Sequence, residues 1–358
     1  MNQEKMYPQR RLLLAGLLAL PFAGLHAAPQ AGGVPLFALT SEQRAASLRE
    51  RTPPQAQAEL IKAAQKTLDR PLHLMSLVRT SGLLDGEGTR AQSQQAQEDW
   101  RQARLQALAW RLSGKQAHLD SARRYVLGWT ANFQPSYNPI DETDLSSLLF
   151  AYDLIADALD DGQREQVRRF GRTLATGYLA EKVLNGGLGT ARNNWQSHRI
   201  KLGTAGAYVS GEPALIAAAQ QRFAEHIPHN IHDDGLPMDF EQRDALHYVV
   251  YTLEPLLMAA LMAQVHGEDW YGANKRLGAA LAWLEPYAKG GKTHEEFVHS
   301  SVSFDRKRAA TGVPGFAGEW QRNGAATVYQ LAARFDMRYA PLAGELHPPA
   351  WVQALFAA

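Results

Sequence analysis

The sequence contains no cysteine among its 358 residues. This absence excludes thiol catalysis, disulfide bonds and cysteine-ligated zinc sites. The chain also lacks an excess of either charge, because 37 basic side chains stand against 36 acidic ones and the formal net charge is +1. A protein that binds nucleic acid needs lysine and arginine clustered on one face or tail. We therefore expect no nucleic-acid partner.

Long hydrophobic runs are also scarce. Near the N-terminus, Arg10 and Arg11 precede an apolar run from Leu12 to Leu25, and the small residue Ala27 follows. A positive segment, a short apolar segment and a small residue form the pattern of an export signal, and this run is too short to span a bilayer comfortably. We therefore expect residues 1–27 to be a signal peptide.

Cleavage after Ala27 would leave residues 28–358 as a periplasmic or secreted protein, without stable insertion into a membrane. An uncleaved membrane anchor is the alternative, but Pro21 and Gly24 interrupt the apolar run. The arginine pair also fits a twin-arginine address loosely. An exported protein without cysteine needs no oxidative folding.

Convincing strand patterns are few, whereas helical periodicity dominates. Apolar residues recur at three-to-four spacing from Ala96 to Leu112 and again from Leu119 to Trp129. Short turns separate such segments, and no low-complexity linker interrupts them. We expect one all-α domain over residues 28–358, with further helices in 144–159, 164–185, 194–209, 213–226, 240–265, 273–287 and 323–335.

Two arrangements of antiparallel helix pairs are compatible with this pattern. An open solenoid would show a fixed sequence period and capping repeats, and the sequence has no such period. A closed or nearly closed ring of helix pairs, an (α/α) toroid, would favour small residues on its inner helices. The run from Gly203 to Ala207 is of this kind. We therefore expect an (α/α) toroid.

A polar motif opens the helix expected from residue 194. Asn194 and His198 are four residues apart and share a face, and Trp195 shares the next face with Arg199. Asn193 is suited to cap the helix by accepting hydrogen bonds from its free backbone amides. A cap does not explain a histidine one turn later, so we expect Asn194 and His198 to face a site.

The helix expected over 240–265 has an unusual polar face. Its core stripe is expected to hold Leu246, Val249, Val250, Leu253 and Leu257. The opposite side would carry Asp244, His247, Tyr248 and Tyr251, with Arg243 at its margin. Tyrosine and histidine in place of lysine and glutamate favour a partly enclosed polar cleft. Tyrosines packed into a second helix layer are the alternative.

The two motifs together resemble the alginate lyase family of polysaccharide lyases. The resemblance covers most of residues 90–340, and its segments are Asn138 to Thr143, Asn193 to Arg199, Arg243 to Leu256 and His294 to Ala309. It implies an exported (α/α) toroid that cleaves an acidic polysaccharide by β-elimination. The implied substrates are alginate, as polymannuronate, or a glucuronan-like polymer.

β-Elimination at a uronate requires donors that neutralise the carboxylate, a base near the C5 hydrogen and an acid near the bridging oxygen. The resemblance implies that Asn194 neutralises the carboxylate with help from Arg243, and that Tyr251 acts as base and acid. His198 is expected to be a base or a second neutralising group, so the identity of the base stays open. Substrate contacts are expected from Asn193, Trp195, Arg199, His247, Tyr248 and Asn138.

The chain departs from the family pattern after the asparagine pair. Well-known alginate lyases have a histidine directly after the pair, whereas this sequence has Trp195 there and its histidine at position 198. A gapless match also aligns the family's arginine with Asp244 rather than with Arg243. The expected roles of Asn194 and Tyr251 are not affected by these differences.

We expect neither a metal ion nor a cofactor. The histidines at positions 226, 229 and 232 recur every third residue, but Pro228 is expected to break the helix between them. His294 and His299 are five residues apart and do not share a helix face, unlike the histidines of a zinc helix.

Two other functions are compatible with the sequence. A glycoside hydrolase on the same toroid would use two carboxylates, such as Asp239 and Glu142. A polysaccharide-binding protein would bind the polymer without cleaving it. Ultraviolet absorbance of the product would separate a lyase from both.

Overall fold

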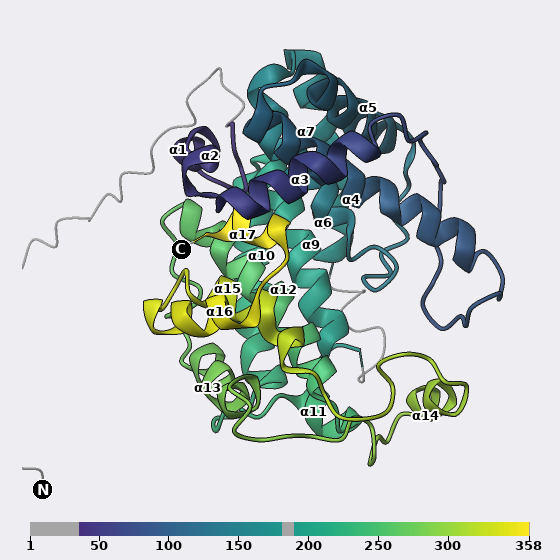
Figure 1. Ribbon diagram of the computed structural model, residues 1–358, viewed down its shortest axis with the longest axis vertical. Coiled ribbons are helices and arrows are strands. Elements are labelled where there is room, and N and C mark those ends of the chain that lie inside the picture. Colours follow the sequence, from purple (N-terminus) through teal and green to yellow (C-terminus); the bar gives the residue numbers. More distant parts are fainter. Residues whose placement is uncertain (1–35, 181–189, 358) are drawn as a thin grey trace, which may run out of the picture. The chain divides into compact units, whose positions relative to one another are not determined.

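The structure is a computed structural model that describes residues 36–180 and 190–357 (Figure 1). These residues belong to one compact unit, Val34–Ala358, and the expected signal peptide lies outside the described residues. Within them, extended residues pair only at two isolated bridges, Ile231 with Pro237 and Glu295 with Glu319. The prediction of an all-α fold is therefore confirmed.

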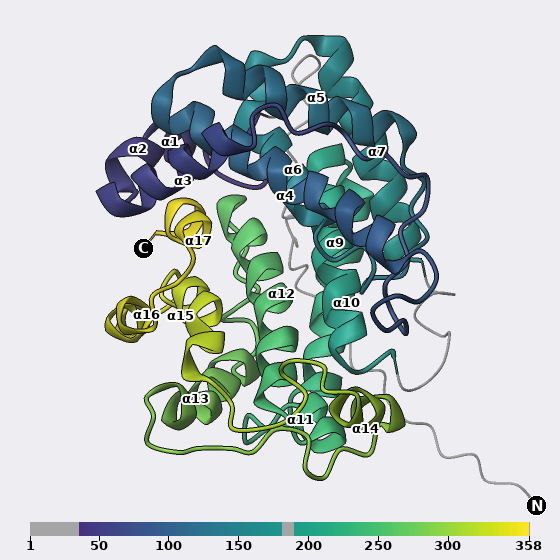
Figure 2. The ribbon, with the colours of Figure 1, turned by 45° about the vertical axis from the view of Figure 1, so that its right-hand side comes forward.

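Helices in the described part of the chain form a ring, visible in Figure 2, in which each packs against the next and the last packs against the first. In order, they are α3 (Pro54–Lys66), α4 (Arg90–Ser113), α6 (Leu145–Ile155), α9 (Asn194–Ser210), α12 (Leu246–Val265), α15 (Ala326–Ala332) and α17 (Ala350–Phe356). Chain segments that are distant in sequence thereby become neighbours.

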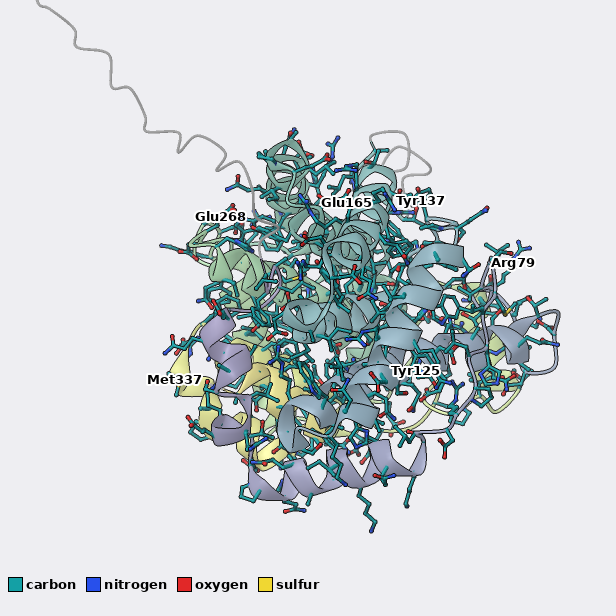
Figure 3. All side chains as sticks on the ribbon, turned by 90° about the horizontal axis from the view of Figure 1, so that it is seen from above. Arg79, Tyr125, Tyr137, Glu165, Glu268 and Met337 are labelled. Atoms are coloured by element: carbon teal, nitrogen blue, oxygen red, sulfur yellow. The ribbon has the colours of Figure 1, made fainter. Side chains whose placement is uncertain are left out.

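Further helices pack against this ring. The second set comprises α5 (Gln116–Asn132), α7 (Asp161–Tyr178), α10 (Pro213–Asn230), α13 (Arg276–Ala288) and α16 (Ala340–Leu346). Helix α5 packs on α4 and α6, α7 on α9, α10 on α9, α13 on α12, and α16 on α15. Two short helices, α1 (Glu42–Ala46) and α2 (Leu48–Arg51), precede the ring, and α14 (Ser303–Ala310) follows α13. Figure 3 shows the side chains on the ribbon and labels Tyr125 of α5 and Met337, which precedes α16. Tyr125 is fully buried, whereas Met337 is 64% exposed.

Small residues let α9 approach its neighbour α7 closely. A Cβ atom added at Gly206 would lie 2.6 Å from the carbonyl oxygen of Gly171, which is a backbone atom that cannot give way. A Cβ atom at Gly203 would lie 2.7 Å from the Leu179 Cδ2 atom. Overpacking of this kind destabilises a core, so the small-residue run serves the close packing that the sequence predicts.

The helix expected over 240–265 is in fact two helices, α11 (Met238–Arg243) and α12, so that part of the prediction is wrong. Asp244 separates them with a left-handed backbone, at φ 49°. Its carbonyl oxygen accepts a hydrogen bond of 2.8 Å from the Phe297 N–H. The carboxylate of Glu296 accepts hydrogen bonds from the N–H groups of Leu246, at 2.7 Å, and His247, at 3.1 Å. A distant loop therefore breaks the helix and caps its second half.

Pro228 does not break α10, contrary to the sequence prediction, because the helix continues to Asn230. Proline removes only one backbone hydrogen bond when it lies in the last turn. The turn is still closed by a 3.0 Å hydrogen bond from the Ile231 N–H to the Ile227 carbonyl.

Helix α12 is a long and strongly apolar element of the ring. In the described part of the chain, it is the one helix with the length and composition to cross a membrane, yet 72% of its apolar window is buried within the fold. Leu246, Val249, Leu253 and Leu257 are fully buried, as expected, whereas Val250 is only partly buried. The opposite face of α12 is left to form one wall of the candidate site.

Candidate active site

Tyr251 of α12 and His198 of α9 lie in contact on the facing sides of their helices. Their ring centroids are 4.2 Å apart and the ring planes are tilted by 50°. His198 is 3% exposed, and its Nε2 atom is buried without a hydrogen-bond partner in the described structure. Tyr251 is partly buried, and burial raises the pKa of its phenol above the ordinary value. Two residues that the sequence selected from separate motifs therefore meet.

The other nitrogen of His198 is held by a loop that precedes α6. His198 Nδ1 lies 2.7 Å from Thr143 Oγ1. Lys201, one turn after His198 on α9, donates from Nζ to both the hydroxyl and carbonyl oxygens of Thr143, each at 2.9 Å. Burial, with the charge of Lys201 as a second cause, lowers the pKa of His198 well below its ordinary value. Both effects favour the neutral imidazole of His198.

Asn194 forms the first residue of α9 and is fixed by a carboxylate. Its Nδ2 atom donates to Asp239 Oδ1 at 2.5 Å, and its backbone N–H donates to the same oxygen at 2.9 Å. Asn194 is 1% exposed and Asp239 is fully buried. The preceding Asn193 accepts a 3.1 Å hydrogen bond from the Trp195 N–H, which confirms the predicted cap.

The carboxylate of Asp239 belongs to a buried chain of hydrogen bonds. Asp239 Oδ2 accepts from Asn230 Nδ2 at 2.9 Å, and Asn230 Oδ1 accepts from the Thr252 hydroxyl at 3.0 Å. Ser197 Oγ lies 2.7 Å from Thr252 Oγ1 and 2.9 Å from His226 Nε2. Burial lowers the pKa of His226 to about 3. The network therefore ties α9, α10, α11 and α12 together behind Asn194.

Arg243 lies beside Tyr248 at the N-terminal end of α12. Its guanidinium is 3.9 Å from the centre of the Tyr248 ring, and its Nη1 donates to Asp305 Oδ1 at 2.6 Å. Arg308 donates to the Tyr248 hydroxyl at 3.4 Å. Asp305 is fully buried and Tyr248 is 7% exposed. The charge of Arg243 is therefore partly compensated, and Arg308 of α14 is a second cation that the sequence motifs did not select.

His247 joins the cluster as an exposed ring. Its centroid is 6.1 Å from that of Tyr251, and the two planes differ by 16°. Arg199, in contrast, is 6% exposed and donates from Nη1 to the Thr190 carbonyl at 2.9 Å. The Arg199 guanidinium carbon lies 5.9 Å from the centre of the Trp195 ring.

Asn138 stabilises a turn. Its Oδ1 accepts a 3.1 Å hydrogen bond from the Ile140 N–H, and its Nδ2 donates to Ser81 Oγ at 3.4 Å. Asp141 in the same turn accepts from the backbone N–H groups of Thr80, at 2.7 Å, and Ser81, at 2.6 Å. The turn therefore holds the loop that contains Thr80 and Ser81. It also places Thr143 beside His198.

The two carboxylates considered for a glycoside hydrolase do not face the site. Asp239 and Glu142 are both fully buried, and burial raises the pKa of each. Glu142 accepts hydrogen bonds from Ser136 Oγ, at 2.7 Å, and from the Tyr178 hydroxyl. Tyr137, labelled in Figure 3, packs edge-on against Tyr178 at 5.4 Å. Both acids are bound by neighbouring protein groups, so the structure does not support the alternative of a glycoside hydrolase that uses this pair.

The histidines considered as metal ligands have other contacts. His232 Nε2 lies 2.9 Å from a Glu241 oxygen, and His226 is part of the buried network. His294 Nε2 lies 3.0 Å from the Asp244 carbonyl oxygen, and the His299 N–H donates to the Asp244 carboxylate at 2.7 Å. Among the described residues, no group of three or more histidine or acidic side chains is arranged to hold a metal ion.

Comparison with known proteins gives a family match. A family model described as alginate lyase matches residues 41–294. A polysaccharide lyase of Stenotrophomonas maltophilia is 38% identical over 73 residues, which are 20% of this chain and 22% of that protein. The chain therefore spans about a fifth of the length of this curated relative.

Solved structures with the same fold are also alginate lyases. One from Bacteroides ovatus has a TM-score of 0.67 and 17% identity, over 90% of this chain and 98% of that chain. Alginate lyase A1-III from Sphingomonas species A1 has a TM-score of 0.61 and 16% identity, over 91% of this chain and 97% of that chain. A variant of A1-III complexed with a tetrasaccharide has a TM-score of 0.60 and 16% identity, also over 91% of this chain and 97% of that chain. Their fold is an (α/α) toroid, so the predicted fold is confirmed.

Proposed function

Because the chain belongs to the alginate lyase family, we propose that it cleaves alginate or a related uronate polysaccharide by β-elimination. The contact between His198 and Tyr251, one turn along α9 from Asn194, carries this proposal. We infer from this contact that a hydrogen-bond donor, an amide and a phenol lie within reach of one sugar. These are the groups that the elimination needs.

Carboxylate neutralisation is assigned to α9. Asn194 Nδ2 uses one of its two hydrogens on Asp239, which leaves the second for the substrate. His198 Nε2 is buried without a partner in the described structure and supplies a further contact. Preorganised donors of this kind stabilise the negative charge that develops on the carboxylate when C5 loses its proton. Arg243 adds positive charge nearby, although Asp305 compensates part of it.

Proton transfer is assigned to Tyr251. The phenolate oxygen takes the proton from C5, the electron pair forms the C4=C5 double bond, and the C4–O4 bond breaks. The same phenol then returns the proton to O4, so no water is consumed. Because burial raises the pKa of Tyr251, the neutral phenol dominates at rest and the phenolate is the scarce, active form.

Substrate contacts are assigned to six residues around this centre. His247 is exposed beside Tyr251, and Tyr248 lies between Arg243 and Arg308. Trp195, Asn193 and Asn138 complete the proposed set of contacts, with Arg199 as a support behind Trp195. No metal or cofactor enters the proposed reaction.

The proposed enzyme is exported and meets its acidic polysaccharide in the periplasm or outside the cell. The signal-like pattern of residues 1–27 supports this location. Cell fractionation with an antibody against the protein tests it, and recovery of the intact chain in the cytoplasm would contradict it.

Ultraviolet absorbance tests the proposed activity. The protein is incubated with polymannuronate, polyguluronate, glucuronan and hyaluronan, and the unsaturated product is followed over time. We expect absorbance to rise with at least one uronate polymer. Reducing ends without absorbance would indicate a hydrolase, and binding without either product would indicate a polysaccharide-binding protein; both outcomes would overturn the proposal.

A further inference from the structure

Lys201 has an unusual position for a lysine, because it is only 5% exposed. Its ammonium group donates to the carbonyl oxygen and to the hydroxyl oxygen of Thr143, each at 2.9 Å. An ammonium group has three donors and no acceptor. The Thr143 hydroxyl oxygen therefore accepts the hydrogen bond from Lys201, and its own hydrogen stays free for another acceptor.

The other polar neighbour of that hydroxyl is His198 Nδ1, at 2.7 Å. If Thr143 donates to it, Nδ1 carries no proton, and the single proton of the neutral imidazole must lie on Nε2. The opposite tautomer would leave the Thr143 hydrogen without an acceptor among the described residues. It would also bury the Nε2 lone pair without a donor, since Nε2 has no partner there.

Two carboxylates support the charged state of Lys201. Burial lowers the pKa of Lys201, but the negative charges of Glu254 and Asp144 oppose this effect. Glu254 lies one turn after Tyr251 on α12, and Asp144 directly follows Thr143. Arg104 is a second cation in the same neighbourhood. The ammonium group therefore lies within a mixed set of charges, which favours its role as a donor.

We propose that Lys201 is a positioning residue that, through Thr143, fixes His198 as the Nε2–H tautomer. In this form, His198 donates a hydrogen bond to the substrate carboxylate and cannot accept the C5 proton. The role toward the carboxylate rests on the proposed function, whereas the tautomer itself is a property of the free protein. Of the two candidate bases left open by the sequence, the proton acceptor is Tyr251.

Nitrogen NMR of the full chain labelled with ¹⁵N-histidine tests the tautomer directly. A His198→Gln variant identifies the resonances of His198. We expect a protonated Nε2 and an unprotonated Nδ1 in the neutral imidazole. A protonated Nδ1 would overturn the proposal.

Isosteric variants test the role of Thr143. Thr143→Val removes the hydroxyl and keeps the shape, so we expect mixed tautomers and a fall in kcat of about tenfold, the size of one lost hydrogen bond. KM should change little. Thr143→Ser restores the hydroxyl and should restore both readouts. Thr204→Val on α9 is the matched control, because Thr204 is fully buried and its hydroxyl has no partner in the described structure.

Lys201→Met tests the cation itself. Loss of the charge should raise the pKa of His198, give mixed tautomers and lower kcat. Unchanged resonances and unchanged kcat in both Lys201→Met and Thr143→Val would overturn the proposal. If the protein cleaves no uronate polymer but His198 carries its proton on Nε2, the proposed function fails and the tautomer assignment stands.

Discussion

The buried carboxylate of Asp239 holds the side-chain amide of Asn194 at 2.5 Å and the Asn194 backbone N–H at 2.9 Å. A carboxylate accepts hydrogen bonds and has none to donate. It therefore selects the Nδ2 end of the amide and leaves the remaining hydrogen of Nδ2 free for the contact with the substrate proposed above. The orientation of Asn194 is set by a fully buried residue.

The Asp239→Asn substitution should disturb this orientation. The amide that it introduces can donate as well as accept, so Asn194 can present either end of its own amide. We expect kcat to fall by about tenfold to a hundredfold, with a loss of stability of about 1–3 kcal/mol from imperfect pairing in the buried network. Steady-state kinetics and urea unfolding measure the two effects. A folded Asp239→Asn protein with unchanged kcat would show that the orientation of Asn194 is not critical.

Tyr251→Phe and Asn194→Ala should each abolish the unsaturated product. Tyr251→Phe removes the only atom of the side chain that can exchange a proton, and Asn194→Ala removes a donor to the carboxylate. Circular dichroism should show an intact fold in both variants. Tyr271→Phe serves as the control for loss of a phenol, because Tyr271 stacks on Phe335 at 4.5 Å. Substantial activity in Tyr251→Phe would mean that another group takes the C5 proton.

The pH profile should report the state of Tyr251. Burial raises the pKa of this phenol, so its phenolate fraction is small near neutrality and increases with pH. We expect kcat to rise by up to about tenfold for each pH unit on the acidic side of the profile. Absorbance assays between pH 6 and pH 9 measure it. A kcat that declines steadily over this range would be incompatible with a phenolate base.

Glu296 should make stability depend on pH. Burial raises the pKa of Glu296 to about 7 from its ordinary value of 4.5. Between these two values the native state binds more protons than the unfolded state, so stability falls as pH rises through this window and then levels off. The contribution of this group is on the order of 3 kcal/mol.

Glu296→Gln removes this titration and the charge of the α12 cap. Urea unfolding at pH 5 and pH 8 should therefore show a smaller loss of stability in the variant than in the native protein. The comparison of the two proteins cancels the titration of all other groups. Equal pH dependence in both would place the pKa of Glu296 near its ordinary value.

The sequence predicts those features of the fold and the candidate site that depend on residues close together along the chain. Periodicity predicted α9 and α12, and four-residue spacing put Asn194 and His198 on one face. Lys201 shows the same kind of signal, because it follows His198 by three residues on the helix. The proposed role of Lys201 depends on its hydrogen bonds to Thr143, however. No local sequence pattern pairs two residues that are so far apart along the chain.

The predictions from the sequence are wrong or incomplete for features that depend on contacts between residues far apart along the chain. The chain turns at Asp244 because Phe297 and Glu296 bind the backbone there, and a periodic pattern carries no trace of that contact. Asp239 is a candidate catalytic acid from the sequence, but in the structure it is fully buried and its carboxylate orients Asn194 through hydrogen bonds. Arg308 reaches Tyr248 from a separate helix, which spacing could not indicate.

The contact between α3 and α17 has a consequence for how the protein is made. Helix α3 begins at Pro54 and α17 ends at Phe356, so α3 is synthesised long before α17 is available to pack against it. A growing chain on the ribosome can form individual helix pairs, but it cannot complete its native topology until the residues of α17 have been added. Contacts of such large sequence separation also slow folding, since the entropy of closing a long loop must be overcome first.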